Sequence, residues 1–106
     1  MGRLVYGAEG THYVIDDTTL RHLRAAMIAK LRRQEPFALT LRGPGTSGAA
    51  ETLWVQPAIA LRFAFDLEDA GELDRERLEK LVMAANSAGG MQVDLAPAEP
   101  RLALAG

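Results

Sequence analysis

Side chains that could carry out acid–base or metal chemistry are scarce in this chain of 106 residues. It has two histidines, His12 and His22, and no cysteine, which excludes disulfides, thiol chemistry and cysteine-based zinc sites. His22 falls within a predicted helix, where a structural hydrogen bond is a commoner role for histidine than catalysis. We therefore expect no metal and no cofactor.

The carboxylates are also explained without catalysis. Asp16 and Asp17 stand where a helix begins, and short acidic side chains there cap free backbone N–H groups, so we favour this role over a cation site. A catalytic acid–base pair needs one carboxylate in an apolar setting. The acidic cluster of the second half lacks that contrast and fits a solvated loop and helix start: Asp66, Glu68, Asp69, Glu72, Asp74 and Glu76. The sequence therefore predicts a protein that is not an enzyme.

Basic residues are concentrated in the first half of the chain. Residues 1–50 carry a formal charge of +3 and residues 51–106 a charge of −5, which together give the net charge of −2. A chain divided in this way can hold a polyanion on one side or pair head to tail with a second copy. The sequence does not separate these two interpretations.

The segment 16–37 combines an acidic start, an apolar stripe and a basic end, and it predicts the first helix. Asp16 is placed as the N-cap, with Ile15 and Leu20 as a hydrophobic staple. Cations in the last turn are favoured by the helix dipole, and Pro36 prevents the helix from continuing. The predicted buried stripe is formed by Leu20, Leu23, Met27, Ile28 and Leu31.

Arg24 interrupts this stripe, because helical spacing places it between Leu20 and Leu31. Its stem can lie along the edge of the core while its guanidinium reaches water. The alternative is an ion pair across a subunit interface. Small residues on the far side of the helix would let a second element approach closely, although alanine is also the best helix former. The candidate interface residues are Arg24, Ala25 and Ala29, with Ala26 beside them.

Period-two alternation predicts strands on both sides of this helix. Residues 3–7 and 12–15 precede it and residues 37–42 follow it, and residues 52–56 and 59–66 open the second half. The glycine-rich segment 43–50 lacks a Gly-Lys-Ser/Thr motif and opens no helix, which favours a connecting loop over a phosphate cradle. Asp74 then caps a second helix, and residues 91–95 alternate along a last strand. The second buried stripe is Leu78, Leu81, Val82 and Ala85.

The order β-β-α-β-β-β-α-β predicts an α+β fold of two layers, a mainly antiparallel sheet with both helices on one face. The other face would be open, and such a face binds a ligand or packs on a second copy. We place one domain at residues 1–96 and a loosely ordered tail at 97–106. With no signal-peptide pattern and no membrane-spanning apolar run, we expect a cytoplasmic protein. The predicted open face carries Arg3, Thr40, Arg42, Arg62, Gln92 and Trp54.

Several separated motifs carry a resemblance to a known family. They are Gly2-x-Leu4-x-Tyr6-Gly7, Asp16-Asp17-x-x-Leu20-x-His22-Leu23, Lys30-Leu31-Arg32-Arg33-x-Glu35-x-Phe37, Trp54-x-x-Pro57-x-Ile59-x-Leu61 and Ala85-Asn86-Ser87. Over residues 2 to about 95 the chain resembles an uncharacterised family of small bacterial proteins. Its members are often labelled ATP-dependent DNA ligase, because a similar module accompanies some such ligases. The resemblance therefore implies a link to DNA ends or repair.

The chain departs from that family pattern at three positions. Gln34 stands where glycine is usual, Pro36 where serine is usual, and Gln56 where histidine is usual. If the histidine matters to the activity of the family, this chain lacks it.

A ligase mechanism does not fit the residues. Ligation through an adenylated enzyme needs a nucleophilic lysine in a Lys-x-Asp-Gly setting. The two lysines are Lys30, followed by Leu-Arg-Arg, and Lys80, followed by Leu-Val-Met. Neither matches, and the chain is much shorter than an adenylation domain. We therefore expect a non-catalytic accessory or interaction module, linked to DNA ligation or repair through contact with nucleic acid or with a ligase.

Two hypotheses of different class remain. In the first, the chain binds DNA: Trp54 stacks on an unpaired base while cations contact phosphates, although a net negative charge and few cations argue against tight binding at physiological salt. In the second, the chain is a homo-oligomeric protein-interaction module that binds no nucleic acid, and Trp54 packs in its core or its interface. The cations of the first hypothesis are Arg21, Lys30, Arg32, Arg33, Arg42 and Arg62.

Overall fold

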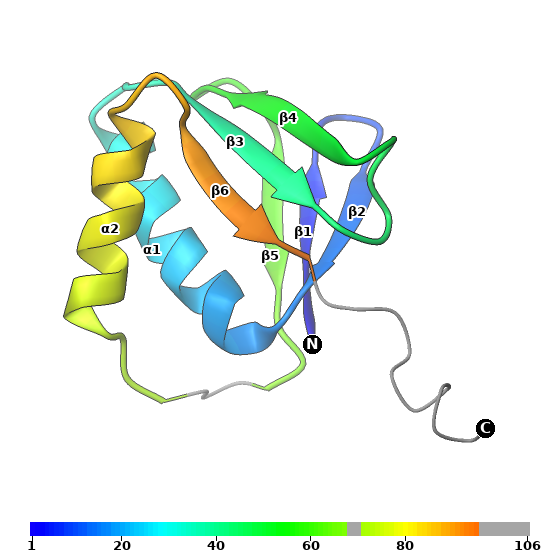
Figure 1. Cartoon of the computed structure of the whole chain (residues 1–106), viewed down its shortest axis with the longest axis horizontal. Coiled ribbons are helices and arrows are strands. Elements are labelled where there is room, and N and C mark those ends of the chain that lie inside the picture. Colours follow the sequence, from blue (N-terminus) through cyan, green and yellow to red (C-terminus); the bar gives the residue numbers. More distant parts are fainter. Residues whose placement is uncertain (68–70, 96–106) are drawn as a thin grey trace.

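The part of the chain that the structure describes folds into two helices and six strands, and the predicted α+β class and element order are confirmed (Figure 1). The computed structural model describes residues 1–67 and 71–95, so the tail predicted at 97–106 lies outside the described residues. The elements are β1 (Gly2–Tyr6), β2 (Thr11–Ile15), α1 (Asp17–Arg32), β3 (Phe37–Arg42), β4 (Ala50–Val55), β5 (Leu61–Ala64), α2 (Arg75–Ala85) and β6 (Met91–Asp94).

The strands form two three-stranded sheets rather than the single sheet expected. One has the order β2-β1-β5 and is antiparallel throughout; the other has the order β4-β3-β6, in which β3 pairs antiparallel with β4 and parallel with β6. The chain changes sheet between β4 and β5. Pro57 has no N–H for a strand ladder, and the Ile59 N–H bonds to the Gln56 carbonyl at 3.0 Å, so the chain turns there. β5 then pairs with β1 instead of continuing beside β4.

Both predicted helix starts are confirmed. An Asp16 carboxylate oxygen accepts a hydrogen bond from the Thr19 N–H at 3.2 Å, and Asp74 accepts from the N–H groups of Glu76 and Arg77 at 3.0 and 3.3 Å. Each aspartate lies one residue before its helix and satisfies donors that the first turn leaves free. Local chemistry alone therefore determines where both helices begin.

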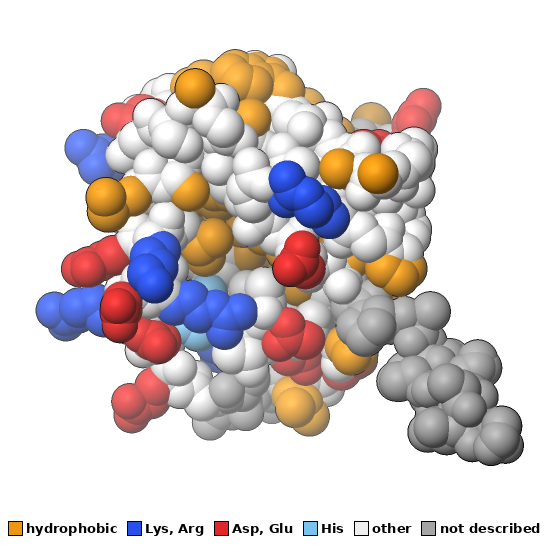
Figure 2. All heavy atoms as spheres, viewed as in Figure 1, with side chains coloured by type: hydrophobic (Ala, Val, Ile, Leu, Met, Phe, Trp, Pro, Cys, Tyr) orange, Lys and Arg blue, Asp and Glu red, His pale blue; other side chains and the backbone are white. Residues whose placement is uncertain are grey.

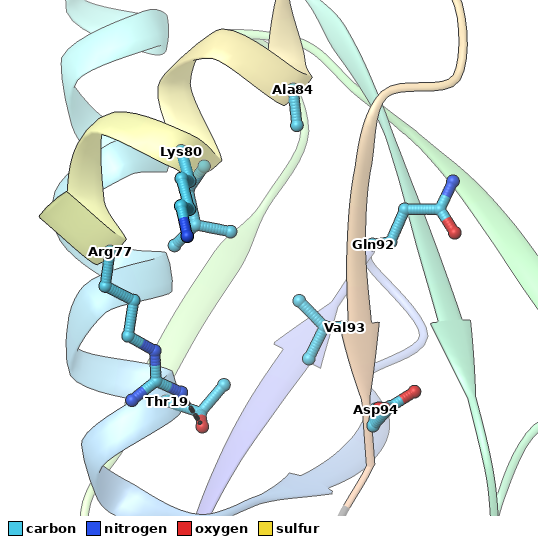
Figure 3. A pocket seen from close by; sticks show the side chains of 8 residues that line it. Thr19, Arg77, Lys80, Ala84, Gln92, Val93 and Asp94 are labelled. Carbon is cyan, nitrogen blue, oxygen red and sulfur yellow. Dashed lines mark hydrogen bonds between the residues drawn. The ribbon is translucent and has the colours of Figure 1, made fainter.

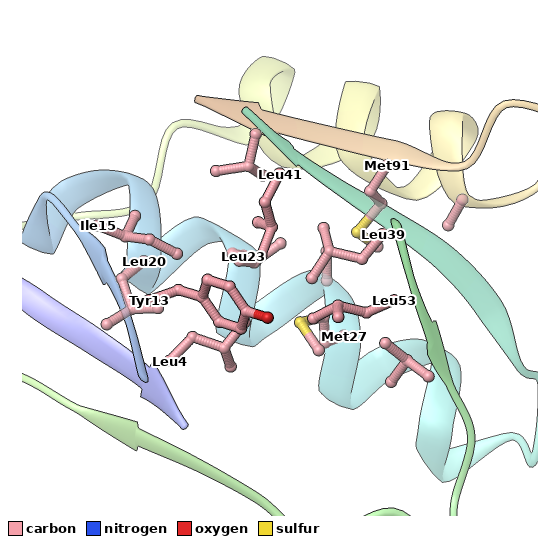
Figure 4. Packing of buried hydrophobic residues seen from close by; sticks show 14 of the residues in the cluster. Leu4, Tyr13, Ile15, Leu20, Leu23, Met27, Leu39, Leu41, Leu53 and Met91 are labelled. Carbon is pink, nitrogen blue, oxygen red and sulfur yellow. The ribbon is translucent and has the colours of Figure 1, made fainter. Parts of the chain in front are cut away.

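The hydrophobic core lies between the two sheets and α1. Figure 4 shows leucines, methionines and Tyr13 from these elements pointing into one cluster. Partly buried side chains of α2 pack against its edge. The largest side chains that are fully enclosed are Leu4, Ile15, Leu20, Leu23, Met27, Leu39, Leu41, Met91, His22 and Val55.

The buried side of α1 is rotated relative to the predicted stripe. Ile28, which was expected in the core, is 42% exposed, whereas His22, Ala26 and Lys30 are buried. These three residues follow one another at intervals of four along one side of the helix, and α2 packs against that side. Ala26 is the small residue that allows the close approach. Packing between the helices therefore decided which side of α1 is covered.

Candidate functional site

The buried polar side chains of the motifs connect structural elements. His22 accepts a hydrogen bond from the Asp74 N–H at its Nε2, at 2.7 Å, and its Nδ1 lies 2.8 Å from the Thr18 carbonyl oxygen. A backbone N–H can only donate and a carbonyl can only accept, so the proton is on Nδ1 and the ring is neutral. The predicted structural hydrogen bond of His22 is present. Asp17, which is also buried, accepts from the Leu67 N–H at 3.0 Å.

Lys30, which was predicted to contact DNA, is instead buried and paired within the fold. Its side chain is buried between the two helix ends, where Nζ donates to Asn86 Oδ1 and lies 2.8 Å from a Glu35 carboxylate oxygen. The hydrogen bond from Lys30 holds the pKa of the Glu35 carboxyl below its usual value. An ammonium that is enclosed and already paired is not available to phosphate.

The other predicted nucleic-acid residues do not lie on one surface. Arg21 and Arg32 share the outward side of α1, Arg33 lies 3.7 Å from Glu35, and Arg42 and Arg62 are exposed on different sheets. Figure 2 shows basic and acidic side chains interspersed on the face that it presents. The charge asymmetry of the sequence is therefore not a continuous basic patch in the fold.

Arg24 stacks on an aromatic ring that the sequence analysis did not single out. Its guanidinium carbon lies 4.7 Å from the centre of the Phe65 ring, and that of Arg21 lies 5.7 Å from the same centre. Phe65 follows β5. Its spacing of two residues from Phe63 was the sequence signal that could have marked it as a neighbour on the same face. Of the other predicted interface residues, Ala25 is half-buried and Ala29 is exposed.

An open sheet surface lies on the side of β4-β3-β6 that faces away from the core. Trp54 is 57% exposed there, and the hydroxyl oxygens of Thr40 and Thr52 lie 2.8 Å apart beside it. Arg42 and Asp94 are register neighbours at the far end of β3. We call this surface the Trp54 face: Ala38, Thr40, Arg42, Ala50, Thr52, Trp54, Gln92 and Asp94. Of the six residues predicted on an open face, Arg3 and Arg62 instead belong to the other sheet.

A hollow of about 420 Å³ lies between the edges of the two sheets and contains two tyrosines. Burial, and secondly hydrogen bonding to the Glu51 carboxylate, raises the pKa of Tyr13 to about 12. Glu51 also accepts from the Ser47 N–H at 3.2 Å, and the Tyr6 hydroxyl donates to the Trp54 carbonyl at 2.6 Å. These polar groups satisfy one another and join the two sheets.

Residues 1–67 and 71–95 contain neither a metal-binding cluster nor a membrane-spanning helix. No group of three or more His, Cys, Asp or Glu side chains in those ranges is arranged to hold a metal ion. In the same part of the chain, neither helix has the length and apolar character needed to cross a membrane. Gln56, where the resemblance led us to expect histidine, is an exposed turn residue after β4.

Comparison with known proteins places the chain in a family but gives it no activity. No curated protein and no solved structure matches it. A family model described as a domain of unknown function, DUF7882, matches residues 1–96, which include every helix and strand that the structure describes. That description names neither a ligase nor bacteria. The chain belongs to the DUF7882 family of domains of unknown function.

Proposed function

We propose that this chain is a non-catalytic interaction module of the cytoplasm that self-associates through the Trp54 face. The observation that carries the proposal is the 57% exposure of Trp54 on the outer side of the β4-β3-β6 sheet, where Ala38, Thr40 and Thr52 are its small neighbours. Tryptophan buries about 150–250 Å² when it is covered, so leaving it in water forfeits much apolar burial. Exposed aromatic anchors on flat surfaces are typical of interface centres.

The Trp54 face is complementary to a second copy of itself. Trp54 pairs with Ala38 near the start of β3, whereas Ala50 pairs with Arg42 at its other end. A two-fold axis near Thr40 would set the indole of each copy against the small residues and the arginine of the other. The register neighbours Arg42 and Asp94 supply one charge of each sign, which a two-fold contact can pair.

The oligomeric state tests this proposal directly. Light scattering over a range of concentrations is expected to give a dimer mass for the wild-type protein and a monomer mass for Trp54→Thr. Val14→Thr is the matched control, because Val14 is also an exposed apolar strand residue, 45% exposed, but lies on the other sheet. It should remain a dimer. A wild-type monomer at high concentration, or a dimer of Trp54→Thr, would refute self-association through this face.

A second candidate function is contact with nucleic acid through α1, which the resemblance to ligase-labelled proteins favours. Arg32 is exposed in the last turn of α1, Arg21 and Arg24 are half-buried beside Phe65, and none of the three forms an ion pair within the described ranges. Under this candidate the partner is a DNA end, or a ligase or repair protein bound to one. Three free cations are few, so binding would weaken steeply with salt.

Fluorescence anisotropy of labelled single- and double-stranded DNA, at low and near-physiological salt, tests this second candidate. Saturable binding that is lost in Arg24→Gln/Arg32→Gln and kept in the control Arg42→Gln/Arg62→Gln would support it. No binding at low salt would eliminate it and leave the self-association proposal untouched.

A further inference from the structure

A groove of about 380 Å³ separates α2 from the strand at the edge of its sheet, β6. Its volume is within the range of about 300–1,000 Å³ that is typical of ligand sites. Figure 3 shows Arg77 and Lys80 projecting from α2 and Val93 projecting from β6 into the space between them, with Thr19 at one end. Leu81 and Ala84 complete the apolar part of its lining.

The free edge of β6 makes this groove different from the other hollows. β6 pairs with β3 on one side only, and no other described strand lies along its second edge. An edge strand presents unpaired backbone N–H and C=O groups, and an extended segment can add to it as a further strand. A helix beside the edge then provides contacts for alternate side chains of that segment.

The charged side chains that line the groove are two cations, Arg77 and Lys80, and one carboxylate, Asp94, so the lining is positive on balance. In Figure 3 the side chains of Gln92 and Asp94 lie on the side of β6 that faces away from α2, whereas Arg77 and Lys80 project from α2. Lys80 forms no ion pair within the part of the chain that the structure describes. Arg77 donates to the Thr19 hydroxyl oxygen at 2.5 Å, which engages one of its several N–H groups.

Arg77 is partly balanced by Asp16 at the N-terminus of α1. Burial would raise the pKa of Asp16, but hydrogen bonds from Thr19 and the positive charge of Arg77 outweigh it and lower that pKa. Of the two cations that line the groove, Lys80 is therefore the one without a carboxylate partner in the described part of the chain. It lies beside the apolar lining formed by Leu81 and Ala84.

We propose that the groove between α2 and β6 binds an extended acidic segment of another protein as an added strand. The backbone of the segment pairs with the free edge of β6. Its inward side chains alternate between an apolar residue on Leu81, Ala84 and Val93 and a carboxylate on Lys80. The groove shares Gln92 and Asp94 with the Trp54 face, but the added strand would use the free edge of β6 rather than the outer side of the sheet, so this inference does not depend on self-association.

A short synthetic peptide tests the proposal. The probe is fluorescein-labelled Thr-Glu-Thr-Val-Thr-Glu-Thr, which has the same order in both directions and so fits a parallel or an antiparallel added strand. Anisotropy with the full chain is expected to show saturable binding that weakens with salt. The same peptide with lysine for glutamate should bind at least about tenfold more weakly, because it places cations against Lys80.

Two further measurements separate strand addition from charge attraction alone. Methylation of alternate peptide nitrogens removes the backbone donors and should abolish binding, since added strands rely on main-chain hydrogen bonds. Lys80→Glu should weaken binding about tenfold, whereas Arg62→Glu, an equal charge change on the other sheet, should leave it unchanged. Amide chemical shifts confirm folding of each variant, and in the wild type the largest peptide-induced changes are expected in β6.

Several results would overturn the proposal. These are equal binding of the glutamate and lysine peptides, binding that survives methylation, or shift changes confined to β3 and β4. No saturable binding at low salt would show that the short β6 edge is simply guarded by α2 and Lys80.

Discussion

Gln34 is the only non-glycine residue in the described part of the chain with a positive φ, 61°. It follows the C-cap of α1 in a Schellman motif: its N–H bonds to the Leu31 carbonyl at 3.0 Å, and the Glu35 N–H bonds to the Lys30 carbonyl at 3.1 Å. A residue with a Cβ is strained in this left-handed conformation. Glycine adopts this conformation without that strain.

Gln34→Gly should raise the free energy of unfolding by about 0.5–1 kcal/mol. Glycine removes the left-handed strain, although greater freedom of the unfolded chain offsets part of the gain. Urea denaturation measures the change, with Gln34→Ala as the control that keeps a Cβ. A glycine variant no more stable than the alanine variant would contradict the strain argument.

Tyr13 makes the stability dependent on alkaline pH. Its pKa is 10.0 as a free side chain and about 12 in the fold, so folding favours the neutral phenol. The resulting stabilisation is complete below pH 10 and is lost as the pH rises toward 12, and two pKa units correspond to about 2–3 kcal/mol. Denaturation over this pH range should show the loss in the wild type and not in Tyr13→Phe. Parallel profiles would mean that Tyr13 titrates normally.

At the scale of elements, the contact between α1 and α2, which we call the helix seam, accounts for the buried polar side chains His22 and Lys30. His22 meets the N-cap of α2, Ala26 allows the helices to approach, and Lys30 meets Asn86 at the other end of α2. Polar groups that are buried and paired in this way fix the orientation of the two helices. The motif residues of α1 are therefore accounted for by helix packing.

His22→Phe should lower the free energy of unfolding by about 1–3 kcal/mol, because the Asp74 N–H loses its buried acceptor. Hydrogen exchange should also become faster at the start of α2. His12→Phe is the matched control, since His12 is exposed on β2. Similar losses in both variants would point to a general effect of phenylalanine rather than to the helix seam.

At the scale of the whole molecule, two sheets share one core, and no described helix or strand covers the outer side of either sheet. The Tyr6 hydroxyl bonds to the Trp54 carbonyl at 2.6 Å, so the strand that carries the exposed indole is fastened to the other sheet. A rigid, exposed aromatic residue loses little side-chain freedom when a partner covers it. This arrangement supports the proposal that the Trp54 face is the contact surface.

If two copies pair through the Trp54 face, thermal stability should depend on protein concentration. Mass action stabilises a folded dimer relative to its unfolded chains, so the Tm of the wild type should rise with concentration. Trp54→Thr should show a Tm that is independent of concentration, and Val14→Thr should behave like the wild type. Calorimetry over a hundredfold range of concentration measures this; a wild-type Tm that stays constant would count against the dimer.

Local sequence determined the elements of this protein. Asp16 and Asp74 marked both helix starts, because capping involves only the next few residues. Alternation marked residues 37–42 as a strand with the bounds that it has in the structure, and the element order gave the α+β class. The exposure of Trp54 on the open side of its sheet also followed from alternation.

Only the tertiary structure decided how the elements share their surfaces. The division into two sheets, the burial of Lys30 and the exposure of Ile28 depend on partners about 50 residues away, such as Asn86 for Lys30 and Trp54 for Tyr6. The six cations that the sequence grouped as one site are separated for the same reason. Periodicity gives the faces of one element, but which face is covered depends on what packs against it. The groove beside β6 likewise depends on how α2 packs next to that strand.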